Sequence, residues 1–321
     1  MPLTRYVRAR NWHNLLVEAD ATLRSRGLPL VRGADARQIT PDELKGIRLR
    51  WPAVYEWEPL RKWLDPIRAA LAKLVEVEIS GIPQPYNGIF MIQVHDGSRW
   101  HDVAIDYHDY TFVNEECVSR CVLYFKMQHL REGYGIPHVV PGGYVTEQMS
   151  LYRYLPYLRQ LRDQRKFNNE VYGRFSTNYA IETRRRAITL LKEQRAFHYE
   201  GGLSIRGRAS FHREIAHSRV CIDLPGNGPF CHRLIDYMAV GACIVSPPHP
   251  TVLNAPLIPG THIIYTRQDM SDLVELCHAL LDDEWAVEEL CRNSRRFFDQ
   301  HLHRDSLAAY YLRTYLDQVV R

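Results

Sequence analysis

The 321-residue sequence contains no run of about eighteen apolar residues, which excludes a conventional membrane-spanning helix. Its first residues, MPLTRYVRARNWHNLL, include basic side chains but lack the apolar stretch of a secretory signal. Internal repeats and low-complexity tracts are also absent. These absences, together with the length, predict a globular protein of about two ordinary domains.

Cysteine is scarce and unevenly spaced. The seven cysteines are odd in number and several lie in apolar runs, which favours reduced, buried thiols and a cytoplasmic location over a disulfide framework. Cys117 and Cys121 are four residues apart, but no second pair of Cys or His stands at zinc-finger spacing. We therefore expect no structural zinc.

Positive charge is in small excess, with a formal net charge of +4. Basic residues do form short clusters, namely Arg184–Arg186, Arg206–Arg208 and Arg295–Arg296. Solvated helix faces and loops are the ordinary explanation for such clusters. A mild basic bias also suits a protein that holds a nucleotide diphosphate or touches an anionic acceptor or membrane surface.

Glycine and proline are concentrated in one informative stretch, between Arg219 and Pro248. Residues 220–224 have the length and composition of a buried strand, and residues 242–246 have the same character. A loop over residues 225–229 and a helical pattern that ends at Gly241 lie between them. The pattern predicts a strand–loop–helix–strand unit whose loop lies at the carboxyl end of a strand, where open α/β sheets bind ligands.

The loop and the first helical turns carry candidate binding residues. Gly226, Asn227 and Gly228 permit close backbone approach, and the N–H groups at the start of the following helix favour an anion. Arg233 can pair with a phosphate through a two-pronged hydrogen bond, and Asp236 can accept hydrogen bonds from ribose hydroxyls. Ordinary charged positions on an amphipathic helix are the alternative interpretation of both residues.

The rest of the chain alternates between strands and helices, which predicts an α/β fold with sheets of the parallel, wound type. In the N-terminal half we expect helices over 15–26 and 59–77 and strands over 89–94, 103–107, 121–125 and 138–140. In the C-terminal half we expect strands over 171–175, 197–200 and 261–265, and helices over 180–193, 209–217, 271–282, 284–299 and 304–320. A charged helical stretch that is broken at Asn168 suggests a domain boundary near residue 165.

Residues 166–300 resemble the nucleotide-binding domain of glycosyltransferases with the two-domain GT-B fold. The resemblance rests on a glycine loop, an arginine, an acidic residue three positions later, a small-residue turn and an apolar strand, with Gly228, Arg233 and Asp236 at the defining positions. It is closest in kind to the exostosin-like, fucosyltransferase-like and spore-protein-like branches, because Ile244 stands where another large group has a second glutamate. The family usually has Glu at position 236, where it contacts the donor ribose; Asp is one methylene shorter.

The resemblance implies a GT-B-like α/β fold of two Rossmann-like domains that face a cleft. Residues 1–165 would form an acceptor-binding domain, residues 166–303 a nucleotide-sugar-binding domain, and residues 304–321 a helix that packs back on the N-terminal domain. The implied activity is metal-independent transfer of a sugar from a nucleotide-sugar donor to a hydroxyl of a glycan, lipid-linked, protein or small-molecule acceptor. The absence of a D-x-D motif agrees with a metal-independent class.

Glycosyl transfer requires groups that neutralise the leaving diphosphate and, in inverting enzymes, a base for the acceptor proton. Arg174 belongs to a Gly-Arg pair that the family often has near the diphosphate, although a surface ion pair is the alternative. Asp106, His108 and Asp109 lie at the end of a predicted strand, where Asp106 or His108 can act as base and Asp109 can orient the histidine. A polar loop is the alternative there. Weaker candidates of the same kinds are Lys166, His95 and His13.

Two other functions fit the same sequence. One is sugar transfer to modified bases of nucleic acid, which the arginine clusters permit but a pI of 8.6 does not require. The other is a catalytically silent nucleotide- or glycan-binding protein that keeps the fold, because a fold alone does not guarantee activity. Nucleic acid is thus an allowed partner rather than the favoured one.

Overall fold

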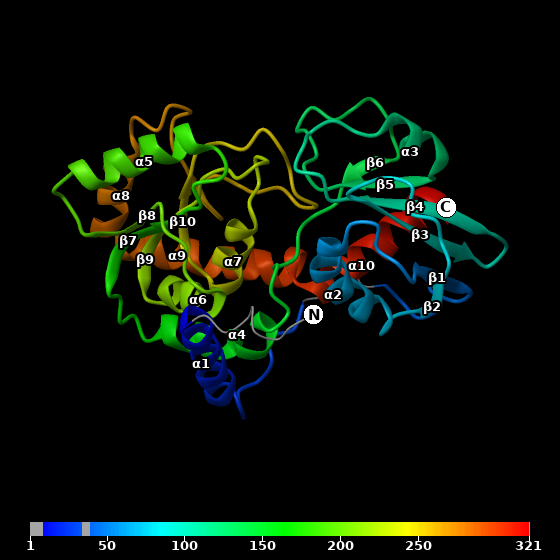
Figure 1. Cartoon of the computed structure of the whole chain (residues 1–321), viewed down its shortest axis with the longest axis horizontal. Coiled ribbons are helices and arrows are strands. Elements are labelled where there is room, and N and C mark those ends of the chain that lie inside the picture. Colours follow the sequence, from blue (N-terminus) through cyan, green and yellow to red (C-terminus); the bar gives the residue numbers. More distant parts are fainter. Residues whose placement is uncertain (1–8, 34–38, 321) are drawn as a thin grey trace.

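Two α/β bodies lie side by side in the computed structural model, which describes residues 9–33 and 39–320 (Figure 1). Within these residues, the first body is built on a six-stranded sheet in the order β2-β1-β3-β4-β5-β6. The second body is built on a five-stranded sheet in the order β11-β10-β9-β7-β8. Two α/β bodies, each built on one sheet, agree with the fold class that the sequence predicts.

The strands of the first body are β1 (Ile47–Pro52), β2 (Glu76–Ser80), β3 (Ile89–Asp96), β4 (Trp100–Asp106), β5 (Leu123–Lys126) and β6 (Val139–Pro141). Those of the second body are β7 (Asn169–Arg174), β8 (Tyr199–Gly202), β9 (Ser218–Ile222), β10 (Cys243–Ser246) and β11 (Ile264–Tyr265). The α-helices are α1 (Ala9–Arg24), α2 (Arg61–Leu71), α3 (Glu115–Arg120), α4 (Leu151–Asp163), α5 (Ile181–Glu193), α6 (Arg208–Ala216), α7 (His232–Val240), α8 (Leu273–Asp282), α9 (Glu284–Phe297) and α10 (Arg304–Tyr315).

The second sheet is parallel throughout, as expected for the wound type. β9 pairs in parallel with β7 and β10, and the outer strands β8 and β11 continue the same direction. All five carboxyl ends therefore meet at one edge of the sheet. Because the buried strands β9 and β10 are short apolar runs covered on both faces, they have the continuous apolar pattern of a parallel sheet.

The first sheet is mixed, which departs from the expected parallel type. β3 runs antiparallel to both β1 and β4, whereas β1–β2, β4–β5 and β5–β6 are parallel pairs. The cause is a tight turn between β3 and β4, in which Asp96 Oδ1 accepts hydrogen bonds from the Ser98 and Arg99 amides at 2.7 and 2.9 Å. Gly97 provides the left-handed φ of 99° that this turn requires.

Three elements of the first body were not predicted from the sequence: β1, β2 and the short helix α3. The helix expected over 59–77 ends earlier, at Leu71 of α2. The following residues, Val75 to Ile79, alternate between apolar and acidic side chains, which is the period of a strand. Most of this stretch belongs to β2 (Glu76–Ser80), an edge strand with every residue at least partly exposed.

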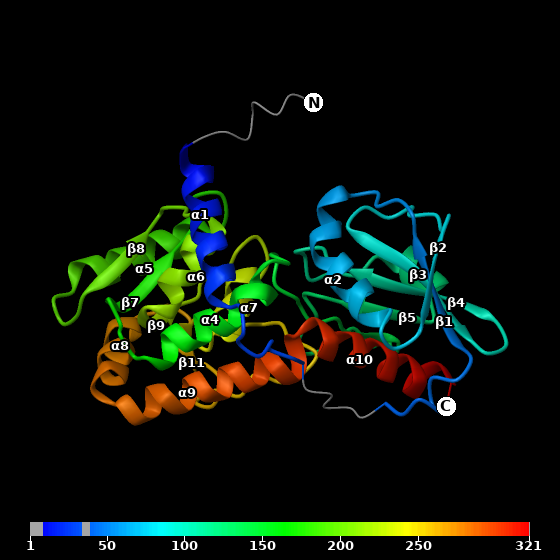
Figure 2. The same cartoon turned by 90° about the horizontal axis from the view of Figure 1, so that it is seen from below.

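The C-terminal helices run from the second body back to the first. α9 and α10 follow each other along one side of the molecule, joined by a π-helical stretch over Phe298–Leu302 (Figure 2). α10 packs on α2, and its Tyr310 hydroxyl donates a 2.6 Å hydrogen bond to the carbonyl of Pro141. The predicted return of the last helix to the first body is therefore confirmed.

α1 and α4 precede residue 165 but pack with α6, on the second body. The exact division of the chain into an acceptor domain and a donor domain stays a prediction. One apolar core cluster includes side chains of both bodies, from Phe90 under the first sheet to Tyr237 under the second. A bilayer-spanning helix, which needs both greater length and more apolar character, is not found among the described residues.

Candidate functional site

The glycine loop joins β9 to α7 at the carboxyl edge of the second sheet. Arg184 holds it in place: Nε and Nη2 donate to the Pro225 carbonyl at 3.1 and 2.8 Å, and Nη1 donates to the Ser176 carbonyl at 2.6 Å. The loops that follow β7 and β9 are thereby tied together. Gly241 ends α7 with a left-handed φ of 87°, as the sequence predicts.

Gly228 is packed against the first body. A Cβ at this position would overlap Gln128 Nε2 and would lie 2.6 Å from the Asp109 carbonyl oxygen. Gln128 also exchanges two hydrogen bonds with the backbone of Phe230, at 3.0 and 3.1 Å. Asn227 donates to the Asp109 carboxylate at 3.1 Å. The fold therefore brings the predicted glycine loop and the predicted catalytic segment together across the two bodies.

A cleft of about 360 Å³ opens beside this contact, at the carboxyl ends of β7, β8 and β9. Its lining is strongly cationic for its size. Five arginines line it, namely Arg174, Arg184, Arg206, Arg208 and Arg233. They face two carboxylates, Asp109 of the first body and Glu147 of the segment that links the bodies. Such an excess of guanidinium groups suits a polyanionic ligand.

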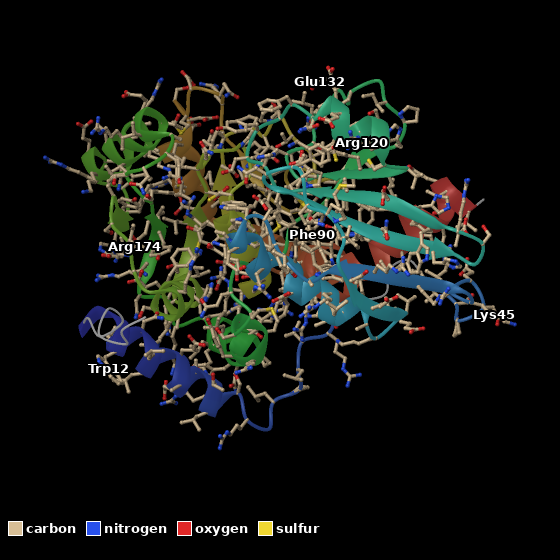
Figure 3. The ribbon with its side chains drawn as sticks, turned by 45° about the vertical axis from the view of Figure 1, so that its right-hand side comes forward. Trp12, Lys45, Phe90, Arg120, Glu132 and Arg174 are labelled. Atoms are coloured by element: carbon tan, nitrogen blue, oxygen red, sulfur yellow. The ribbon has the colours of Figure 1, made fainter. Side chains whose placement is uncertain are left out.

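Arg174 stands at the end of β7, at the cleft wall (Figure 3). Its Nε donates to Glu214 at 2.7 Å, its Nη1 donates to the Ser204 hydroxyl at 2.7 Å, and Nη2 pairs with Glu200. The side chain thus lines the predicted site, but two carboxylates already hold it.

Arg233 lies in the first turn of α7 and is buried. Its Nη1 donates to Asp223 Oδ1 and to the Leu224 carbonyl, both at 3.0 Å, and its guanidinium lies over the Phe175 ring at 4.7 Å. Burial opposes its charge, but nearby Cys231 and Asp223 raise the pKa of Arg233 above its ordinary value. Among the described residues, Nε and Nη2 have no protein acceptor, so they are the groups that a ligand can use.

Asp236 does not line the cleft, in contrast to the predicted ribose contact. It is fully buried, accepts a 2.7 Å hydrogen bond from Thr146, and lies 3.1 Å from His212 Nε2 and 3.7 Å from Arg208. Burial would raise the pKa of Asp236, but His212, Arg208 and Thr146 together lower it. The carboxylate therefore joins α7 to α6 and to the linking segment, and this geometry leaves it no face for a ribose.

Asp106 is also buried, beneath the end of β4. Its Oδ2 accepts hydrogen bonds from Lys126 Nζ at 2.8 Å and from the Tyr124 hydroxyl at 2.5 Å. Burial opposes the charge of Asp106, but His108, Lys126 and Tyr124 lower its pKa below the ordinary value. An enclosed carboxylate that is already ion-paired cannot reach an acceptor hydroxyl, so Asp106 is not placed to act as the predicted base.

His108 stands between Asp106 and Asp109 in the sequence, but its side chain does not line the cleft. Its ring packs over Gly88, where a Cβ would lie 2.6 Å from the ring Nε2, and its Nδ1 is 3.5 Å from Asp106. The neighbouring Asp109 does line the cleft. Of the three predicted catalytic residues, the structure thus places one in the site.

Two side chains that line the cleft, Glu147 and His232, were not predicted. Glu147 pairs with both Lys62 of α2 and Arg208 of α6, so it connects the bodies at the cleft wall. His232, the first residue of α7, stacks on Trp63 with ring centroids 4.8 Å apart. The partners of Glu147 and His232 come from distant parts of the chain, so the sequence does not reveal these contacts. Of these partners, only Arg208 belongs to a cluster that is visible in the sequence, Arg206–Arg208.

His232 is an unusual histidine for a cationic cleft. Its Nδ1 is buried and has no hydrogen-bond partner among the described residues. Burial and the positive charge of Arg208 lower the pKa of His232 to about 4. The imidazole is therefore neutral at pH 7 and contributes no charge to the cleft.

A larger chamber of about 740 Å³ lies on the other side of the glycine loop. Gly226, Asn227 and Gly228 line it together with prolines that follow β10 and with the first residues of α5. The glycine loop thus separates the arginine-lined cleft from the larger, proline-lined chamber. In the part of the chain that is described, no three His, Cys, Asp or Glu side chains are grouped as a metal site requires.

No family model matches this sequence, and no curated protein matches it. Among solved structures, the fold is similar to that of a glycosyltransferase from Rickettsia africae ESF-5, with 11% identity and a TM-score of 0.45 over 68% of this chain and 70% of that one. It is also similar to a Listeria monocytogenes protein assigned as a UDP-N-acetylglucosamine 2-epimerase, with 10% identity and a TM-score of 0.36 over 64% of this chain and 62% of that one. Both similarities concern the path of the chain, so the function must be inferred from the cleft.

Proposed function

We propose that this protein transfers a sugar from a nucleotide-sugar donor to an acceptor hydroxyl, with the donor diphosphate in the arginine-lined cleft. The supporting observation is the set of five guanidinium groups at the carboxyl edge of a parallel sheet, next to a glycine loop and the start of α7. Arginine pairs with phosphate oxygens through two parallel hydrogen bonds, and this edge of an α/β sheet is where nucleotides bind.

The five arginines have different roles in this proposal. Arg206 and Arg208 are about half exposed, at 50% and 43%, and can turn towards a ligand. Arg174, Arg184 and Arg233 are buried and fix the loops that shape the cleft, and Arg233 also keeps its Nε and Nη2 for the ligand. As the bond between the sugar and the diphosphate breaks, negative charge grows on the phosphate oxygens, and fixed cations stabilise that charge without a metal.

Asp109 is the residue that we propose to take the acceptor proton. It reaches the cleft from the first body, opposite the arginines, and the Asn227 side chain fixes its orientation through a 3.1 Å hydrogen bond. The acceptor oxygen then attacks the anomeric carbon while the electron pair of the broken bond leaves with the diphosphate. In Asp109→Asn, we expect nucleotide binding to persist and transfer to be lost.

A catalytically silent nucleotide-binding protein is the second candidate. Its support is that Asp106 and Asp236, two residues of the expected machinery, are both buried and paired. Measuring nucleotide release from a panel of nucleotide sugars separates the two functions, because a silent protein binds the donor but releases no nucleotide.

The test of the proposal is nucleotide affinity, measured by calorimetry with UDP, GDP, ADP, dTDP and CMP. We expect one nucleotide to bind, and Arg206→Ala to weaken it by roughly ten- to a hundredfold, as for loss of a charged hydrogen bond of about 1.5–3 kcal/mol. Arg120→Ala is the matched control, because Arg120 is an exposed arginine on α3, outside the cleft lining. Binding of none of these nucleotides, or equal affinity in Arg206→Ala, would contradict the proposal.

A further inference from the structure

α1 carries an apolar stripe that faces solvent. Four large side chains on it are more than half exposed: Trp12 at 55%, Leu15 at 54%, Leu16 at 66% and Leu23 at 54%. Together with exposed Ala19, they recur every three or four residues, which places them on one face of a helix. Figure 3 shows Trp12 on the side of α1 that is turned away from the second body.

The opposite face of α1 is the one that attaches the helix to the protein. Ala21 is buried there, and Glu18 accepts a 3.1 Å hydrogen bond from Gln148. Asn14 Oδ1 accepts a 2.9 Å hydrogen bond from the Ala209 amide, in the first turn of α6. α1 is therefore held on α4 and α6 by one face while its apolar stripe stays free of the rest of the described chain.

The sequence segment that contains α1 carries a strong positive excess. Residues 1–32 contain six arginines against two carboxylates, an excess of four that equals the net charge of +4 of the whole chain. Residues 33–321 are consequently neutral in sum. No acidic residue occurs before Glu18, whereas Arg5, Arg8 and Arg10 precede the stripe. The entire cationic excess of the sequence thus lies within residues 1–32, the segment that contains α1.

We propose that α1 is an interfacial helix that lies on an anionic membrane surface, with the stripe in the boundary between headgroups and acyl chains. Tryptophan and leucine on one side of a helix, with a cluster of arginines beside them, are the combination that binds such a surface. Each arginine near an anionic leaflet adds about 1 kcal/mol of attraction. Charge complementarity favours anionic lipid over a second copy of this chain, whose α1 would bring the same positive charge.

This placement would bring one rim of the cleft near the membrane, because that rim packs on the face of α1 opposite the stripe. Gly207 packs directly on Asn14, and its neighbours Arg206 and Arg208 line the cleft. Ile205, 61% exposed, stands at the same rim. If the proposed sugar transfer holds, the acceptor is then a hydroxyl presented at the membrane surface, as in a lipid-linked sugar. Membrane binding itself does not depend on that function.

Sedimentation of the full chain with vesicles tests the proposal. We expect binding to phosphatidylcholine vesicles that contain about 30% phosphatidylglycerol, and weak binding to phosphatidylcholine alone. The double variant Trp12→Ala/Leu16→Gln should bind at least about tenfold more weakly, because two exposed anchors are lost. Trp285→Ala is the matched control, because Trp285 is 71% exposed on α9, outside the stripe; it should bind like the wild type.

The proposal is overturned if the wild type does not bind the anionic vesicles or if the double variant binds equally well. A wild-type dimer in sedimentation velocity that becomes monomeric in the double variant would show that a second copy covers the stripe, and would also overturn it. Circular dichroism and nucleotide affinity of the double variant should be unchanged. If the wild type binds no nucleotide, that result counts against the proposed function alone. The vesicle-binding result does not depend on it.

Discussion

The arginines of the cleft fall into two groups that call for different experiments. Arg233 donates to Asp223, a carboxylate with no exposed surface, so Arg233→Ala would leave a buried charge without its partner. Breaking such a pair costs about 3–5 kcal/mol, and lost activity in that variant would report folding as well as binding. Arg206 is half exposed and has one long ion pair, 3.5 Å from Glu214, so we expect its removal to leave the fold intact.

His232 gives a prediction at the scale of one side chain. Its pKa is about 4 in the folded protein and about 6.5 in an unfolded chain. Between these pH values the imidazole binds a proton in the unfolded state but not in the folded state. Stability is therefore fully present above pH 6.5 and declines as the pH falls towards 4. Between pH 7 and 5 we expect this histidine to cost about 2 kcal/mol of unfolding free energy.

Urea unfolding of the wild type and of His232→Gln at both pH values measures that cost. The variant cannot take up the proton, so its stability should fall by about 2 kcal/mol less than that of the wild type over the same interval. Parallel pH profiles for the two proteins would show that His232 is protonated in the folded state and that Trp63 and Arg208 do not keep it neutral.

At the scale of elements, the second body was largely predictable because its strands are short apolar runs and its helices have one apolar face. The first body was less so. Its β3–β4 hairpin reverses the chain at an Asp-Gly-Ser turn, but the general alternation of strands and helices led to the prediction of a parallel sheet there. The alternating residues of β2 were assigned to the end of a helix.

The candidate site was predictable in place but not in detail. The glycine loop and its arginines carry local signals, and the structure places Arg174, Arg233 and Asp109 around one cleft. The burial of Asp106 and Asp236 depends on partners 20 and 90 residues away in sequence, Lys126 and Thr146. A pattern of neighbouring residues cannot reveal such contacts, so a buried ion pair and a catalytic carboxylate look alike in sequence.

The loop between β9 and α7 supplies a prediction with its own internal control. In Gly228→Ala, the new methyl group would overlap Gln128 and lie 2.6 Å from the Asp109 carbonyl, so the two bodies must separate locally. Overpacking of this kind costs about 1–3 kcal/mol. Gly226→Ala places its methyl group 3.6 Å from Cys231 Sγ, an ordinary contact, and should cost little. Urea unfolding of both variants checks this, and equal stabilities would contradict the tight contact.

At the scale of the whole molecule, the two bodies share more than a cleft. α10 leaves the second body and packs on α2 of the first, where Arg313 pairs with Glu43 at 2.7 Å. The apolar cluster that contains Phe90 also contains Tyr237, so the core is continuous between the sheets. Gln128 adds the hydrogen bonds to Phe230 across the boundary. Unfolding either body alone would therefore expose core surface of the other.

We consequently expect one cooperative thermal transition for the 321-residue chain, in which the calorimetric and van't Hoff enthalpies agree. Its enthalpy should be on the order of 200 kcal/mol, the value for a chain of this length that unfolds as one unit. A nucleotide bound in the cleft should move the whole transition upward, because its site includes residues of both bodies. Two resolved transitions, with a nucleotide shifting one alone, would mean that α10 and the shared core do not couple the bodies, and that the cleft belongs energetically to the second body.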